Sequence, residues 1–79
     1  MELVLRRIDR EIVAVEVRLQ GIARRFGVRD WRELEKLFTA RGVGTPELDM
    51  LWPEYLYLRE RLENLRRRRR EVLESLERL

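Results

Sequence analysis

The sequence predicts an all-α fold: an antiparallel hairpin of two long helices with a short intervening helix, dimerising into a helical bundle. Two long segments repeat apolar residues at alternating spacings of three and four, the period of paired helices. Glycine-containing breaks at residues 27–28 and 42–46 divide the chain into three segments. Hydrophobic residues make up 44% and charged residues 42%, which is typical of helices with ionic outer faces. We expect a single helical domain over residues 1–79, with helices at 2–26, 31–41 and 50–78.

The first segment has one long apolar seam. Its members are Met1, Leu5, Ile8, Ile12, Val15, Leu19, Ile22 and Phe26. Gly27 follows at the left-handed position that commonly ends a helix. Residues 13–19 also alternate with period two and are rich in β-branched residues, as in a strand. The helix is favoured because the seam continues beyond both ends of this stretch. Val13 and Val17 then lie off the seam, so we expect this helix to contact more than one neighbour.

The second segment predicts a short helix that packs on the longer ones. Asp30 to Glu33 resembles a capping box, in which the Asp30 carboxylate accepts from the backbone of Glu33 and Glu33 reaches back. The apolar face consists of Trp31, Leu34, Leu37 and Phe38, and Gly42 ends the segment. A helix of this length is not stable in water without tertiary contacts.

The third segment offers two helix starts and a second seam. Thr45 can cap a helix with Pro46 at its first position, whereas a start at Asp49 puts Pro53 in the first turn. The predicted boundaries, 50–78, take the second start. The seam consists of Leu51, Tyr55, Leu58, Leu62, Leu65, Arg69, Val72, Leu76 and Leu79. Two seams of nearly equal length, joined by a short connection, predict antiparallel pairing.

Arg69 is the one charged residue in the second seam. In the antiparallel pairing, residues whose numbers sum to about 78 face each other, which places Arg69 near Asp9. We predict an Arg69–Asp9 ion pair across the seam, because a buried unpaired charge is costly. The alternative is that the guanidinium extends to water over its aliphatic stem.

A basic run, Arg66 to Arg70, interrupts an otherwise mixed charge pattern. Residues 59–70 carry seven Arg against two Glu, a net charge of +5, so Arg66, Arg67, Arg68 and Arg70 are candidate contacts to nucleic acid or an acidic partner. Five consecutive helical residues turn through about 500°, so they cannot all face one ligand. A solvated face neutralised by neighbouring glutamates is the favoured interpretation. Residues 20–28 resemble the first half of a helix-turn-helix, but the apolar spacing of residues 33–37 does not continue that motif.

Aromatic residues gather around the connection between the long segments. Trp31, Trp52 and Tyr57 are candidate anchors for a protein partner, with Tyr57 off the seam and therefore exposed. The alternative is that these aromatics close one end of the hairpin.

The composition excludes much of catalysis. The chain has neither Cys nor His, so thiol nucleophiles, imidazole bases, zinc fingers and disulfides are ruled out. Ser75 is its single serine, and the carboxylates form no metal or acid–base spacing. We expect a non-enzyme with no cofactor and no metal. Without an apolar run of about 20 residues or a signal-peptide pattern, we expect a cytoplasmic protein. Few thermolabile residues and dense opposite charges hint at a thermophilic source.

The order of features over residues 16–65 resembles short prokaryotic antitoxin-type proteins. A helix ends in a basic-aromatic-glycine step, residues 24–27, and a short acidic-apolar helix follows. A glycine-rich break then precedes an aromatic-acidic entry, residues 51–55, into a leucine-rich helix. The resemblance implies binding and masking of a toxin partner through helices. We therefore expect a homodimeric, non-catalytic protein–protein interaction module with an antitoxin-like or regulatory role toward a partner protein. The alternative is nucleic-acid binding through residues 59–70.

Overall fold

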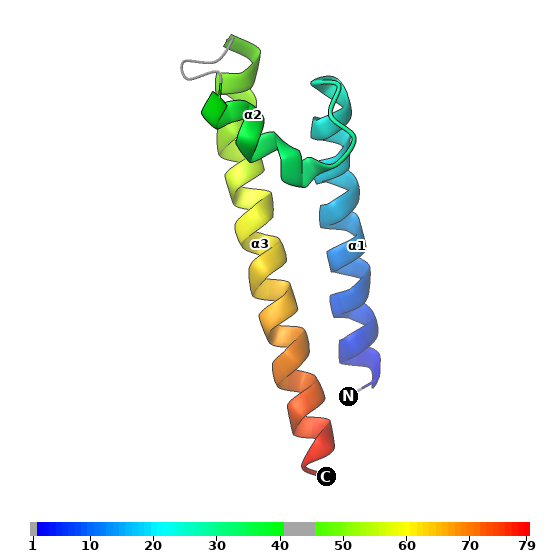
Figure 1. The fold of residues 1–79 in the computed structure, drawn as a ribbon. Helices are drawn as coiled ribbons and strands as arrows, with labels where there is room; N and C mark the ends of the chain where they lie inside the picture. The colour runs from blue at the N-terminus through cyan, green and yellow to red at the C-terminus, as the bar shows by residue number, and fades with distance from the viewer. Residues whose placement is uncertain (1, 41–45) are drawn as a thin grey trace.

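A computed structural model of the chain describes residues 2–40 and 46–79. Within these ranges the elements are the helix α1 (Glu2–Arg25), the 3₁₀ turn η1 (Trp31–Glu33), and the helices α2 (Leu34–Ala40) and α3 (Pro46–Glu77), as Figure 1 shows. The all-α prediction is confirmed, and residues 13–19 are helical, so the strand interpretation is wrong. The expectations for Met1, Gly42 and Thr45, and for the Phe38 side chain, lie outside the residues and side chains described.

The two long helices lie side by side and run in opposite directions, so both termini lie at the same end (Figure 1). The molecule is elongated, with extents of 51 × 19 × 17 Å. The predicted seam residues meet between α1 and α3 and form the core. Its buried members are Ile8, Val15, Leu19, Ile22 and Ala23 of α1, Leu34 of α2, and Tyr55, Leu58, Leu62 and Leu65 of α3.

The C-terminus of α1 is closed by the glycine that the sequence predicts. Gly27 has φ +70°, the left-handed conformation that only glycine adopts at little cost. The N–H of Val28 donates to the Ala23 carbonyl at 3.0 Å, and the N–H of Gly27 donates to Arg24 at 3.2 Å. These two bonds form a Schellman motif, which satisfies carbonyls at the helix end and turns the chain back toward the core. The helix ends at Arg25, one residue before the predicted boundary.

The second segment begins differently from the predicted capping box. The Asp30 carboxylate accepts from the backbone N–H of Arg32 at 3.1 Å, not from Glu33. The Glu33 N–H donates instead to the Asp30 carbonyl at 3.0 Å, which is the i+3 bond of a 3₁₀ turn. Because this backbone bond uses the Glu33 N–H, the Asp30 carboxylate caps the N–H of Arg32 instead. The predicted helix 31–41 is therefore η1 followed by α2.

The third helix starts earlier than the predicted residue 50. It begins at Pro46, where a missing N–H costs nothing, and it ends at Glu77, one residue before the predicted end. Pro53 consequently lies inside the helix and not in its first turn. It cannot donate to the carbonyl of Asp49, but both residues are exposed, so water can satisfy that carbonyl.

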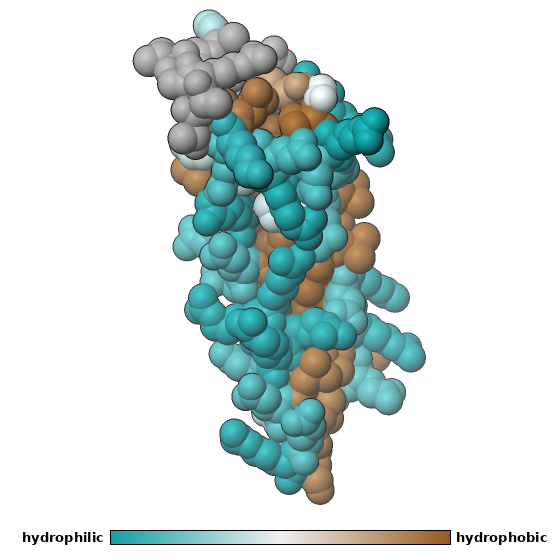
Figure 2. Space-filling model, viewed as in Figure 1, coloured by the Kyte–Doolittle hydropathy of each residue, from teal (hydrophilic) through white to brown (hydrophobic). Residues whose placement is uncertain are grey.

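The short helix α2 covers only part of the helix pair. It crosses α1 and α3 near the end where α1 stops, and it buries Leu34 completely (Figure 1). Beyond it, the helix pair continues with half-buried leucine and isoleucine side chains. We call Leu5, Ile12, Leu73 and Leu76 the uncovered seam. Figure 2 shows hydrophobic atoms on this face between α2 and the lower end of the molecule, interrupted by hydrophilic side chains.

Candidate interaction surfaces

Four ion pairs join α1 to α3 along the two edges of their contact. They are Arg18–Glu54 at 3.0 Å, Glu11–Arg61 at 2.6 Å, Glu16–Arg66 at 3.0 Å and Asp9–Arg69 at 2.7 Å. All eight side chains are partly exposed, so each pair contributes at most about 1 kcal/mol. Their main effect is on register. If α1 slid along α3 by seven residues, Arg18 would lie opposite Arg61 in one direction, and Glu11 would lie opposite Glu54 in the other. Either slide brings like charges together.

Arg69 occupies its seam position with its charge at the protein surface. Its Nε donates to Oδ1 of Asp9, the partner that the seam arithmetic predicts. The Arg69 side chain is 43% exposed and the Asp9 side chain 51% exposed, so the pair lies at the edge of the seam and not within it. The arginine stem covers apolar surface while its guanidinium reaches both water and a carboxylate.

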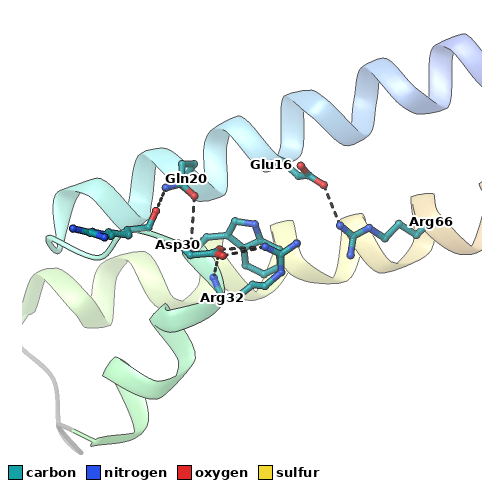
Figure 3. Close-up of polar contacts among 7 residues, drawn as sticks. Glu16, Gln20, Asp30, Arg32 and Arg66 are labelled. Carbon is teal, nitrogen blue, oxygen red and sulfur yellow. Dashed lines mark hydrogen bonds and ion pairs between the residues drawn. The ribbon is translucent and has the colours of Figure 1, made fainter.

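The arginine run is divided among several faces. Arg66 is paired with Glu16, as Figure 3 shows, and Arg69 is paired with Asp9. Arg67 and Arg70 face outward, and helical spacing puts glutamates within one or two turns of both. Arg68 lies on the opposite edge, where it lines a hollow of about 180 Å³ with Arg7 of α1. These residues therefore form no single basic patch.

The three candidate aromatic anchors do not converge. Trp52 stacks on Tyr55, with ring centroids 5.3 Å apart, and it packs against the core. Trp31 is half-buried beside α1, and the Arg32 guanidinium lies 5.0 Å from its ring centroid. Tyr57 is 63% exposed on the outer side of α3. Trp52 therefore belongs to the closed end of the helix pair, whereas Trp31 and Tyr57 reach different surfaces.

Gln20 holds the turn after α1 against the side of that helix, as Figure 3 shows. Its amide nitrogen donates to the Arg29 carbonyl, and its amide oxygen accepts from the backbone N–H of Trp31 at 3.4 Å. The arrangement encloses a shallow hollow of about 370 Å³ between α1 and the turn. Sequence reasoning gave Gln20 no role. The one signal was that it is the only glutamine in the chain.

Two valines of α1 line this hollow and point away from the core. Val13 is 60% exposed and Val17 is 65% exposed. Gly21, one turn further along the same helix, is also exposed, and a methyl group added to it would meet nothing within 4 Å. The sequence predicted a second neighbour for these valines. The hollow beside Trp31 occupies one side of them, and the other side is open.

Two groups in the described part of the chain have shifted pKa values. The N–H that Arg32 donates to the Asp30 carboxylate lowers the pKa of Asp30. Burial raises the pKa of the Tyr55 phenol. Both pKa values move away from neutral pH, so at that pH the carboxyl of Asp30 stays ionised and the phenol of Tyr55 stays neutral.

Comparison of the chain with protein-family models, curated proteins and solved structures gave no match. Within residues 2–40 and 46–79, no three Asp or Glu side chains are placed to hold a metal ion. No helix in these ranges has the length and apolarity needed to cross a membrane.

Proposed function

We propose that this protein is a non-catalytic helical protein–protein interaction module, with an antitoxin-like or regulatory role toward a partner protein. The observation that carries the proposal is the exposure of apolar side chains that the fold does not use. Val13 and Val17, one turn apart on the same side of α1, are each at least 60% exposed. Apolar surface left uncovered in clusters is characteristic of binding faces.

The proposal includes an antiparallel helical hairpin that dimerises through the uncovered seam. This surface continues the contact that α2 covers at the other end of the helix pair. Its charges are balanced, because Asp9–Arg69 and Glu16–Arg66 are paired on the same side. Two copies related by a two-fold axis can therefore bury their uncovered seams as a four-helix bundle without bringing like charges together.

Sedimentation of the purified chain at tens of micromolar tests the dimer. We expect the wild type to have the mass of a dimer and Leu73→Glu to have that of a monomer. Tyr57→Glu, the same charge on an outer face of α3, is the control and should remain dimeric. Circular dichroism of each variant verifies that its helices are retained. A monomeric wild type at these concentrations would contradict the dimer.

Nucleic-acid binding is the second candidate function. It is favoured by Arg67, Arg68 and Arg70, which are exposed and form no ion pair within the described part of the chain. It is disfavoured by their distribution over different faces. Titration with generic duplex DNA separates the two functions: the interaction module should not bind even at low salt. Binding that is lost steeply with added salt would favour the second candidate.

A further inference from the structure

The outer side of α1 has a second heptad pattern in addition to the core seam. We call the following residues the outward face of α1: Arg10, Val13, Ala14, Val17, Gly21 and Arg24. All six are exposed, and at about 100° per residue they fall within a sector of about 100°. Two turns with apolar or small side chains are thus bracketed by an arginine at each end.

The small side chains leave room for another helix on this face. Gly21 lies inside α1, where glycine is less favourable than alanine by about 1 kcal/mol, and no neighbour in the fold requires it. Because Ala14 and Gly21 have small side chains or none, the surface on either side of Val17 is recessed. The half-buried Trp31 ring lies at the edge of the adjoining hollow and supplies an apolar wall.

The unpaired charges around this surface have one sign. Arg10 and Arg24, together with Arg29 at the hollow, form no ion pair within the residues that the structure describes. The two acids at the hollow, Glu16 and Asp30, are already paired with Arg66 and Arg32. A partner must therefore supply negative charge at the ends of the contact and apolar side chains in its middle.

A second copy of the chain does not fit this requirement. An antiparallel pairing centred on Val17 would place Arg10 opposite Arg24 of the other copy at both ends. A parallel pairing would place each arginine opposite itself. Both arrangements bring like charges together, so the outward face differs from the uncovered seam in the partner it can accept.

We propose that the outward face of α1 and the adjoining hollow bind an amphipathic helix of a partner protein whose apolar stripe is bracketed by acidic residues. This inference rests on the proposed function. Arg10 and Arg24 are fourteen residues apart, or about 21 Å along the helix. The partner helix should therefore carry Asp or Glu about fourteen residues apart, with apolar residues at helical spacing between them.

A designed peptide tests this surface directly. The probe is a fluorescein-labelled, 20-residue amphipathic helix with Leu and Ala on one face and glutamates fourteen residues apart. A matched peptide carries lysines at those two positions. Fluorescence anisotropy at low salt should show binding of the acidic peptide and none of the basic one. Absence of acidic-peptide binding at several hundred micromolar protein, or equal binding of both peptides, would overturn the inference.

Paired variants separate the site from general charge attraction. Arg10→Glu/Arg24→Glu should weaken binding of the acidic peptide at least tenfold. Arg67→Glu/Arg70→Glu, which changes the net charge equally on α3, should change it less than threefold. Val17→Glu should also weaken it at least tenfold, with the helices retained. Equal weakening by the two double variants would overturn the inference.

Sedimentation of the same variants distinguishes this inference from the proposed function. We expect Arg10→Glu/Arg24→Glu to remain dimeric, because the dimer uses the uncovered seam. If that variant becomes monomeric, a second copy covers the outward face and the inference is wrong. If the peptide fails to bind while the wild type is dimeric, the inference fails and the interaction module stands.

Discussion

The glycines show how one residue type has opposite effects at two positions of the same chain. Gly27 adopts φ +70° and ends α1, whereas Gly21 is an exposed interior residue of that helix with open space around it. We predict that Gly27→Ala lowers the free energy of unfolding by about 1 kcal/mol, because alanine is strained at positive φ. Gly21→Ala should raise it by about 0.5–1 kcal/mol, through helix propensity.

Urea denaturation monitored by circular dichroism measures both substitutions. The pair is internally controlled, since each replaces glycine with alanine in or next to α1. A stability gain from Gly27→Ala would show that the Schellman motif does not end the helix as described.

Tyr55 predicts a loss of stability at alkaline pH. Burial raises the pKa of its phenol in the folded state, so its contribution to stability is fully present below about pH 10. As the pH rises from there through the raised pKa, the unfolded chain ionises first and stability falls. We predict that Tyr55→Phe reduces this alkaline loss and that Tyr57→Phe, at an exposed tyrosine, does not. Thermal melts between pH 8 and pH 11 measure the difference, and identical profiles for the two variants would contradict it.

Some residue-level contacts could not be read from the sequence. The pattern around Asp30 identified a helix start, but not that a 3₁₀ turn takes the Glu33 N–H and leaves the Asp30 side chain to Arg32. The role of Gln20 depends on how the chain turns back after Gly27, a tertiary event without a local signature. By contrast, the proximity of Arg69 to Asp9 could be worked out from the sequence, because heptad spacing determines which residues of two antiparallel helices face each other.

The ion pairs along the two edges of the α1–α3 contact specify the register of the helices more than their stability. Arg18→Glu should destabilise the fold by about 0.5–1 kcal/mol, because it places a second carboxylate beside Glu54. Adding Glu54→Arg should restore most of this loss by reversing the pair. Chemical denaturation of the two single variants and the double variant gives the coupling energy. A coupling near zero would show that this pair does not restrain the register.

Leu34 packs α2 into the core. Leu34 is completely buried, and Leu→Ala at such positions costs about 2–5 kcal/mol. We predict that Leu34→Ala destabilises the fold by this amount, whereas Leu3→Ala, at an exposed leucine of α1, changes stability by less than about 0.5 kcal/mol. Thermal and urea unfolding measure both. A small effect of Leu34→Ala would mean that α2 adds little to the core.

The elements themselves were largely predictable from periodicity. Spacings of three and four predicted both long helices, although residues 13–19 also match a strand. The longer helical pattern prevailed because α1 buries Val15 and Leu19 on the seam while Val13 and Val17 face outward. The predicted start of α3 was wrong because Pro53 was expected in the first turn of the helix. The exposed interior of α3 accommodates it.

At the scale of the whole molecule, a short third helix on an elongated helix pair leaves two unlike surfaces. The uncovered seam is apolar with balanced charges, and the outward face of α1 is apolar with arginines only. The sequence identified Trp31, Trp52 and Tyr57 as candidate anchors or as the closed end of the hairpin, but their separation depends on the packing of α2 and the 29–32 turn. The outward face itself was visible only as valines that the core seam did not use.

The antiparallel arrangement of α1 and α3 underlies every surface described above. Paired spin labels measure it directly, since the chain has no native cysteine that would compete for labelling. With labelled chains diluted in unlabelled protein, labels at Arg6 and Glu71 should lie about 20–30 Å apart, because packed helix axes are about 8–10 Å apart and both side chains point outward. Labels at Arg6 and Met50 should be more than about 30 Å apart, given about 1.5 Å of rise per residue. An Arg6–Met50 distance shorter than the Arg6–Glu71 distance would contradict the fold and the interaction surfaces built on it.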